Sequence, residues 1–581
     1  MQVAEAMALE IKRQNVRAVF TLMSEETAKL VVHLTQLGVA VYHTRHDSTA
    51  IGMADGYSRA CGEIGVAIVG RGPGLTNSLN TLITAAKGST KLLVLTGDSA
   101  ADQGVRGPAS LATFERIGKY IDQDALLGAT NIKHVNLNFP ASAVADLAAS
   151  FDRVRRGGSI AVNVPSDVFD AAAGSAASTL DDHGRAELPM HPNRADISMV
   201  ADLVGTTWAA RRPLILAGGG AVASGCRDEL VHIGELTGGL LGNTLLANSI
   251  FRSEEFDVGV IGTLATPLAL ELIAETDLVL AFGASLNRLT TYGGELFKRA
   301  RVVQFDSDPD AFGRYQPTEV NVLGDARLSA AALAEELIRR GYHGTGYRTT
   351  ETAAKIRDFI LDDTFSDRGR AGALDPRAVM SAIDKVLPEE RTLVVDGGHH
   401  LEFSIAHISV PDPAGFVFPI EYFSVGCGLA SALGAAVARP DRLTVLDVGD
   451  GGLMMNLGDL DTAVRYGLRL VVLVSNDSAF GSEVHFLQLA GLPDDAARYS
   501  NPSFEAVGRS LGLNAITVES IADVEKLRGA LVGLSIPLLV DCKFTTEVRA
   551  GWVDLMFGSS PDRGTPSESR QAPGPTPQPT P

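Results

Sequence analysis

The chain has 581 residues, which is more than one hydrophobic core usually organises, so we expect about three domains of ordinary size. Its 45% hydrophobic and 20% charged residues are an ordinary globular composition. The net charge of -19 and the lack of a Lys/Arg cluster argue against a nucleic-acid surface, and no apolar run reaches the length of a membrane span. Small-molecule chemistry is the expectation that remains.

The N-terminal residues lack the basic-then-apolar pattern of a signal peptide. The four cysteines, Cys61, Cys226, Cys427 and Cys542, lie far apart and form no CxxC pair. This spacing favours reduced thiols in the core over disulfides or a zinc site. Together these features predict a cytoplasmic protein.

The first predicted domain, residues 1–170, contains short apolar runs that each end in a polar or glycine turn. The runs are "GVAVYHTRHD", "GVAIVGRGPG", "KLLVLTGD" and "GSIAVNVPSD". Apolar runs that alternate with amphipathic segments are typical of parallel sheets covered by helices. Residues 171–193 are small, polar and proline-containing, which indicates a linker.

The second and third predicted domains repeat this pattern over residues 190–345 and 370–557. The second contains "PLILAGGGA", "LVLAFGASL" and "VVQFDSDPD", and the third begins near "ALDPRAVMSAIDKVL". We therefore predict an α/β protein with three doubly wound parallel-sheet domains. Residues 558–581 have too little apolar surface to offset the entropy of ordering, so we expect a disordered tail.

A βαβ unit is predicted in the third domain. "LTVLDVG" and "LRLVVLVS" are expected strands, and "LMMNLGDLDTAVRYG" between them has Leu453, Leu457, Leu460 and Val464 at helical spacing. The crossover makes the two strands parallel, so Asp450 and Asp477 follow strand ends at the same edge of the sheet. The two acids could then share one ligand.

Two acids and a glycine turn at one sheet edge suit a metal that bridges a diphosphate. Ligands of open α/β sheets bind beyond the carboxyl ends of strands, and magnesium is commonly held by one or two carboxylates and phosphate oxygens. The alternative is that "GDGG" and "SNDSAFG" are only tight turns. The chain has no GxxxxGK[ST] and no evident GxGxxG that opens a helix with an acid some 20 residues on, which argues against a P-loop or a nicotinamide site.

Five segments in order resemble those of thiamine-diphosphate-dependent enzymes of the acetolactate synthase type, the large catalytic subunit. They are "RHDSTAIGMADGYSRA" (45–60), "GRGPGLTNSLNTLITA" (70–85), "VVDGGHH" (394–400), "FSVGCGLASALGAA" (423–436), and Gly449-Asp450-Gly451 followed by Asn476-Asp477. The resemblance extends over all three domains. It implies a pyrimidine-binding N-terminal domain, a central domain and a diphosphate-binding C-terminal domain.

The resemblance also implies the cofactors, thiamine diphosphate and Mg²⁺, and their binding residues. Magnesium would be held by Asp450, Asp477 and the carbonyl of Ala479, with Asn476 as the alternative ligand. The cofactor-binding residues implied are Gly72, Pro73, Asn77, Gly398, His399, Phe423, Val425, Gly449, Asp450, Gly451, Gly452, Asp477, Ala479 and Phe480. The active sites would lie at the subunit interface of a homodimer or homotetramer, between the N-terminal domain of one subunit and the C-terminal domain of another.

Val425 would stand as a wedge beneath the bent cofactor, where a stiff β-branched side chain suits a fixed support, and the carbonyl of Phe423 would accept from the aminopyrimidine. The alternative for Val425 is an ordinary core position. The family's activating Glu is replaced by Asp47, whose side chain is shorter by about 1.5 Å. Our hypothesis is that Asp47 still activates the cofactor, and the competing hypothesis is a catalytically weak homologue that only binds thiamine diphosphate.

The substrate pocket and the central domain are less determined. Arg71 could pair with a substrate carboxylate or form a structural salt bridge. His43, His46, Glu483 and His485 could move protons or be structural residues. The central domain is similar to one that binds FAD in some relatives and only braces the assembly in others; we expect bracing here, with FAD as the alternative.

The expected function is decarboxylation of a 2-keto acid followed by transfer of the acyl-anion equivalent to a second carbonyl. The expected partners are small 2-keto acids or aldehydes. The alternatives are a non-ligating 2-keto acid decarboxylase, an aldehyde lyase or the catalytically weak homologue.

Overall fold

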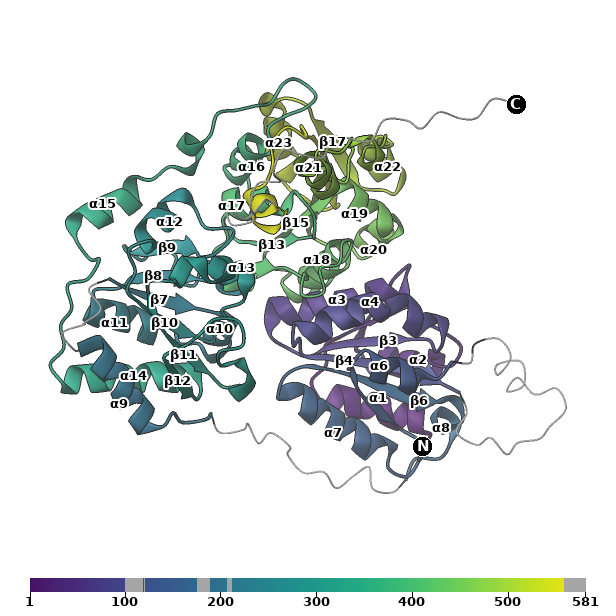
Figure 1. The fold of residues 1–581 in the computed structure, drawn as a ribbon. Coiled ribbons are helices and arrows are strands. Elements are labelled where there is room, and N and C mark those ends of the chain that lie inside the picture. The colour runs from purple at the N-terminus through teal and green to yellow at the C-terminus, as the bar shows by residue number, and fades with distance from the viewer. Residues whose placement is uncertain (100–118, 120, 175–188, 206–211, 558–581) are drawn as a thin grey trace, which may run out of the picture.

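The computed structural model describes residues 1–99, 119, 121–174, 189–205 and 212–557. Within these residues the strands form three six-stranded sheets, and every pairing within the sheets is parallel. Figure 1 shows the sheets as three lobes, with the teal central domain beside the purple N-terminal and green C-terminal domains. The predicted α/β class with three doubly wound parallel sheets is confirmed.

The N-terminal sheet has the strand order β2-β1-β3-β4-β6-β5. Its strands are β1 Ala18–Thr21, β2 Ala40–His43, β3 Gly65–Val69, β4 Leu92–Asp98, β5 Lys133–Asn136 and β6 Ser159–Pro165. The helices are α1 Val3–Arg13, α2 Ala28–Gln36, α3 Asp47–Cys61, α4 Pro73–Lys87, α6 Gln123–Ala129, α7 Ala143–Arg155 and α8 Ser166–Asp170.

The central sheet has the strand order β12-β11-β10-β7-β8-β9. Its strands are β7 Pro213–Ala217, β8 Leu240–Asn243, β9 Asp257–Val260, β10 Leu278–Phe282, β11 Arg301–Asp306 and β12 Val320–Leu323. The helices are α9 Arg194–Gly205, α10 Gly219–Ser224, α11 Arg227–Thr237, α12 Pro267–Ile273, α13 Arg288–Thr291 and α14 Ala326–Arg339, followed by α15 Thr350–Asp358 on the way to the next domain.

The C-terminal sheet has the strand order β14-β13-β15-β16-β18-β17. Its strands are β13 Arg391–Val395, β14 Phe416–Val417, β15 Leu443–Gly449, β16 Leu470–Asn476, β17 Asn514–Val518 and β18 Leu538–Lys543. The helices are α16 Pro376–Asp384, α17 Leu401–His407, α18 Gly428–Ala438, α19 Asp450–Met455, α20 Leu460–Arg465, α21 Gly481–Leu489, α22 Phe504–Ser510, α23 Val524–Leu531 and α24 Gly551–Phe557.

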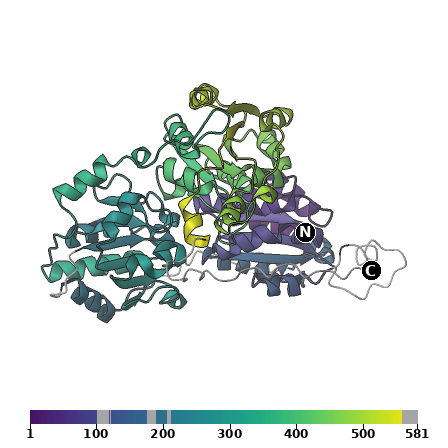
Figure 2. The ribbon, with the colours of Figure 1, turned by 45° about the horizontal axis from the view of Figure 1, so that its top comes forward.

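The N- and C-terminal domains of the chain pack against each other through α3 and α18 (Figures 1 and 2). One apolar core joins them, with Ile51 of α3 and Leu433 of α18 both fully buried in it. Glycines allow the helix backbones to approach, because a Cβ at Gly56 would collide with the backbone of Ser431, and one at Gly434 with the backbone of Met53. These contacts make the two domains one packed unit.

Two buried polar clusters also cross this boundary. The Arg59 guanidinium donates to both oxygens of Glu421, at 2.7 and 3.0 Å, and its Nε donates to Asp55. The carboxylate of Asp459 accepts from the Arg45 amide at 2.8 Å and from the Thr49 hydroxyl at 2.6 Å. Buried charges held by such complementary partners fix the relative placement of the two domains.

The helix predicted across residues 453–467 is interrupted in the structure. α19 ends at Met455, Asn456 has φ of -130°, a 3₁₀ turn covers Leu457–Asp459, and α20 then begins. The apolar spacing predicted the buried face, but it could not show that Asn456 leaves the helix to donate to the carbonyl of Gly426.

The four cysteines are all described and all free, as predicted. No helix in the described ranges is both long and apolar enough to cross a membrane. The predicted linker 171–193 is described only at its two ends, and the predicted disordered tail 558–581 lies outside the described residues.

Candidate active site

The two acids of the βαβ unit lie at one edge of the C-terminal sheet. β15 and β16 are neighbours and run in parallel, with Gly449 opposite Ser475. Asp450 follows the end of β15, and Asp477 follows the end of β16. The shared edge predicted from the sequence is therefore present.

The Asp450 carboxylate is held by a set of hydrogen-bond donors. Its Oδ1 accepts from the Tyr499 hydroxyl at 2.9 Å, and its Oδ2 accepts from Asn501 at 2.6 Å and from the Ser478 amide at 2.9 Å. The Tyr499 oxygen also lies 3.1 Å from the carbonyl oxygen of Ala479. Two of the oxygens expected to bind magnesium are thus gathered around one hydroxyl group.

Sequence reasoning missed Tyr499 and Asn501. They reach Asp450 through a loop that begins more than 20 residues beyond it, and no local periodicity marks such a contact. A polar "YSN" after the βαβ unit was the only available signal.

Burial and electrostatic repulsion act on both acids. Burial, and then the charge of Asp450, raise the pKa of Asp477 to about 7, and burial also raises the pKa of Asp450. Two acids that resist ionisation beside each other gain from a cation between them. Their oxygens, with the carbonyl of Ala479, are the ligand type that Mg²⁺ prefers.

The described residues contain no group of three or more His, Cys, Asp or Glu placed to hold a metal. The carboxylates of Asp450 and Asp477 and the carbonyl of Ala479 nevertheless fit magnesium. This ion commonly takes one or two carboxylates and completes its shell with phosphate oxygens and water. Asn476, the alternative ligand, donates through Nδ2 to Asp541 at 2.8 Å and accepts from Asn501 at 3.0 Å. Both polar atoms of its side chain are therefore already hydrogen-bonded, so Asp477 is the expected side-chain ligand beside Asp450.

The glycine turn after β15 has no space for side chains. A Cβ on Gly451 would lie 3.0 Å from the Tyr499 hydroxyl, and a Cβ on Gly452 would lie 2.7 Å from Oδ2 of Asp396. The Gly449 amide donates to Nε2 of His400, whose Nδ1 then donates to Asp447. Burial opposes a charge on His400, whereas Asp447 favours one and raises the pKa of His400 to about 9. We assign the neutral imidazole in this geometry, because Nε2 needs its lone pair to accept from Gly449.

His399 and Gly398 lie beside this turn. Burial lowers the pKa of His399 to about 3, so its ring is neutral, and its Nε2 accepts from the Ala550 amide at 3.0 Å. Gly398 has φ of +140°, a conformation that L side chains rarely adopt. His399 therefore also anchors the segment that leads into α24.

Three of the implied cofactor-binding residues have exposed side chains. Val425 is 40% exposed and Phe423 is 67% exposed, and Phe480 is also exposed. Phe423 has φ of +57°, a strained conformation for a large side chain, and such strain is concentrated at functional sites. The alternative of Val425 as an ordinary core residue does not fit its exposure.

Asp47 is the first residue of α3 and is 7% exposed. Asn77 of α4 donates to its Oδ2 at 3.1 Å. One turn further along α4, Asn80 accepts from the hydroxyl of Ser424 at 2.6 Å, and Ser424 precedes Val425. The N-terminal edge that carries Asp47 therefore faces the loop that carries Val425.

The remaining N-terminal cofactor positions begin α4. Gly72 has φ of +57° and its amide donates to Gln123, and Pro73 follows as the first helical residue. Proline suits that place because its missing amide would have no helical partner.

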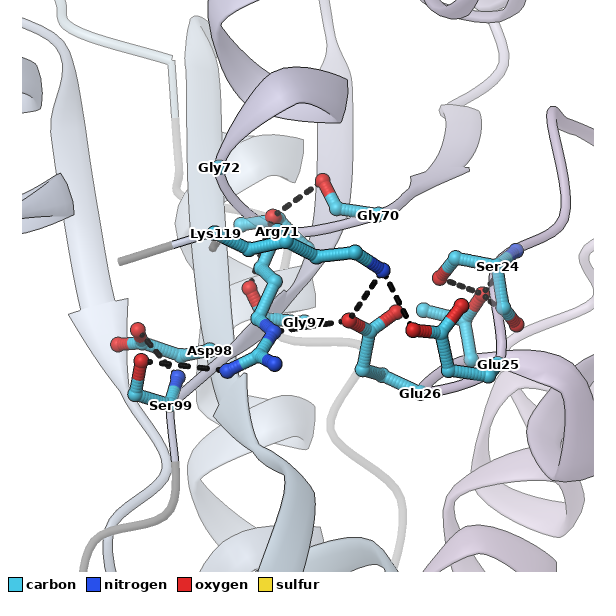
Figure 3. A network of polar contacts seen from close by, with 12 residues as sticks. Ser24, Glu25, Glu26, Gly70, Arg71, Gly72, Gly97, Asp98, Ser99 and Lys119 are labelled. Carbon is cyan, nitrogen blue, oxygen red and sulfur yellow. Dashed lines mark hydrogen bonds and ion pairs between the residues drawn. The ribbon is translucent and has the colours of Figure 1, made fainter. Parts of the chain in front are cut away.

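Arg71 lies in a buried network rather than at an open surface. Its Nε donates to Oε1 of Glu26 at 2.8 Å and its Nη1 donates to Ser99 at 3.3 Å, and Lys119 donates to the same Glu26 oxygen at 3.3 Å (Figure 3). Of the two sequence alternatives for Arg71, the structure has the salt bridge. Its partner Glu26 was not foreseen, because it follows a different strand.

The other polar candidates lie apart. The ring of His46 accepts from the Ser48 amide at the start of α3, and burial lowers the pKa of the half-buried His43. Glu483 is exposed at the start of α21, whereas His485 is buried with its ring 4.5 Å from that of His399. His485 is thus brought next to an expected cofactor-binding residue.

Comparisons with known proteins agree with this geometry. Models of the N-terminal thiamine pyrophosphate (TPP) binding domain, the central domain and the C-terminal TPP binding domain of thiamine pyrophosphate enzymes match residues 1–114, 200–333 and 396–542. Together they cover more than half of the chain.

Among curated relatives, the chain is 27% identical to the acetolactate synthase large subunit of Parasynechococcus marenigrum, over 87% of this chain and 80% of the relative. It is 25% identical to a putative acetolactate synthase large subunit of Mycobacterium tuberculosis, over 94% of this chain and 99% of the relative. It is 24% identical to the sulfoacetaldehyde acetyltransferase of Castellaniella defragrans, over 90% of this chain and 89% of the relative. The chain therefore belongs to the thiamine pyrophosphate enzyme family and is a thiamine-diphosphate-dependent enzyme of the acetolactate synthase-like type.

Proposed function

We propose that the protein is a magnesium-dependent carboligase or decarboxylase that acts on a small 2-keto acid, in the manner of an acetolactate synthase. The observation that carries this proposal is the placement of two acids, Asp450 and Asp477, at one sheet edge. The exposed Val425 loop, which lies against the N-terminal edge with Asp47, adds to it.

Each part of the site has a proposed task. Asp450, Asp477 and the carbonyl of Ala479 would hold magnesium, and the glycine turn would admit the diphosphate close to the backbone. Bound thiamine diphosphate would supply a nucleophilic thiazolium and an electron sink for chemistry at a carbonyl carbon. Val425 would support the cofactor from below, and Asp47 would hold a proton at the pyrimidine nitrogen.

The reaction type rests on the relatives, whose names describe acetolactate synthesis and acetyl transfer. A panel of 2-keto acids and aldehydes, incubated with protein, thiamine diphosphate and magnesium, tests it by mass analysis of the products. We expect a ligated hydroxyketone from a 2-keto acid. Carbon dioxide without a ligated product would instead support a simple decarboxylase, and cleavage of a hydroxyketone to an aldehyde would support a lyase.

We propose an assembly of two or four chains in the cytoplasm, with sites shared between subunits as in the family. Co-expression of Asp47→Ala chains with Asp450→Ala chains tests the sharing, because mixed oligomers would contain some sites with both acids intact. Recovery of up to about a quarter of the sites is expected from random pairing of two chains. No recovery would place each whole site within one chain, an arrangement that the packing of α3 on α18 also allows.

FAD is not included in the proposal. The glycines after β7 pack against the loop after β10, since a Cβ on Gly220 would lie 2.8 Å from Gly283. This contact accounts for the glycines without a flavin. A yellow purified protein would contradict this part of the proposal.

A further inference from the structure

The loop that carries Val425 is fixed through the residue that follows it. Gly426 has φ of +89°, and its amide donates to Asp396 at 2.8 Å. Its carbonyl accepts from Nδ2 of Asn456 at 2.6 Å. Both polar groups of one backbone residue are therefore held by side chains from two different elements.

Asp396 is the side chain that holds the amide of Gly426. It is fully buried after β13, and it also accepts from the Gly428 amide at 3.0 Å, at the start of α18. It thus joins the Val425 loop to the sheet. Asn456 holds the carbonyl, and its half-buried side chain reaches Gly426 because the chain leaves the helical conformation there.

The helix that precedes Asn456 lies behind the whole loop. A Cβ on Gly452 would lie 3.2 Å from Cγ1 of Val425, and a Cβ on Gly426 would lie 3.0 Å from the sulfur of Met455. The helix α19 begins with Asp450 and is followed directly by Asn456. Its six residues span only about 9 Å, so Asn456 lies close to the metal-binding end of this short helix.

We propose that Asn456 is a positioning residue that ties the Val425 wedge to the metal-binding end of α19. The inference rests on the proposed function of the site. Within the described part of the chain, the Asn456 side chain donates to the Gly426 carbonyl, and it acts through that backbone. Loss of its amide donor would make the Val425 loop more mobile. The glycine turn at the diphosphate end would stay in place.

The test compares Asn456→Asp and Asn456→Ala with the control Asn514→Ala, an exposed asparagine at the start of β17. Asn456→Asp keeps the size of the side chain and removes the donor, so it guards against a failure to fold. The first readout is amide hydrogen exchange of residues 423–428 in cofactor-free protein. The second is magnesium-dependent affinity for thiamine diphosphate, and the third is the exchange rate of the cofactor C2 proton.

In both Asn456 variants we expect faster amide exchange in residues 423–428 and an affinity within about threefold of the unaltered protein. The C2 proton exchange should slow by roughly tenfold or more, since small displacements of a reacting group are costly. Val425→Ala should slow C2 exchange similarly, and the double variant should add little because both changes remove the same support. Asn514→Ala should match the unaltered protein in all three readouts.

Unchanged amide exchange in residues 423–428 would overturn the inference, as would full additivity of the Asn456→Ala and Val425→Ala effects. A tenfold loss of affinity with normal C2 exchange would also overturn it, because it would place Asn456 at the diphosphate end. If the unaltered protein did not bind thiamine diphosphate, the proposed function would fail. The amide-exchange result would still report whether Asn456 holds the loop.

Discussion

Asp477 is the second acid at the edge where β15 and β16 end. In the metal-free protein, burial and the charge of Asp450 raise its pKa to about 7. Folding then favours the protonated acid. The stability that this group contributes is fully present below its unfolded pKa of about 3.9 and is lost as pH rises through about 7.

Asp477→Asn should therefore stabilise the metal-free protein, and the gain in Tm should be larger near pH 8 than near pH 5, by roughly 2 °C or more. Thermal unfolding at the two pH values measures this difference. The exposed Asp363→Asn serves as the control and should show no such pH-dependent gain. An equal shift at both pH values would contradict the assignment of a protonated Asp477 in the metal-free protein.

Asp47 is the residue proposed to activate the cofactor, and this role can be separated from binding. Asp47→Ala should retain thiamine diphosphate affinity but reduce turnover by roughly 100-fold or more, because a positioned proton-transfer group typically contributes that much. Asp47→Glu restores the longer side chain of the family and is the matched control. Steady-state turnover and cofactor titration check both variants, and full activity of Asp47→Ala would refute the assignment.

At the scale of elements, the sequence predicted the strands well because each is a short apolar run that ends in a polar turn. β15 and β16 were predicted from "LTVLDVG" and "LRLVVLVS", and their adjacency followed from the βαβ crossover. The break at Asn456 was not predictable, because its cause is a contact with Gly426, 30 residues earlier in the chain. Arg71 likewise gained its partner, Glu26, from another strand.

The contact between α3 and α18 gives a prediction of its own. Gly56→Ala would place a methyl group against the backbone of Ser431, and such overpacking costs about 1–3 kcal/mol. We expect a fall in Tm of several degrees. Gly529→Ala in α23 has open space around its Cβ and should be neutral or slightly stabilising. Equal Tm values for the two variants would contradict this packing.

At the scale of the whole molecule, the largely buried Arg59 joins the N- and C-terminal domains. Arg59→Ala would leave Asp55 and Glu421 without their cation, and loss of one partner of a buried ion pair costs about 3–5 kcal/mol. We expect lower stability and weaker cofactor binding together. Arg357→Ala, which removes an exposed pair with Asp358, is the control. Normal cofactor affinity in Arg59→Ala would show that the site does not depend on this domain contact.

The most direct test of the whole account is calorimetric titration of the purified protein with thiamine diphosphate, in magnesium and in excess chelator. We predict binding in magnesium that is lost in chelator, and loss of binding in magnesium for Asp450→Ala. Equal affinity with and without magnesium, or full affinity of Asp450→Ala, would contradict a metal-held diphosphate at the ends of β15 and β16.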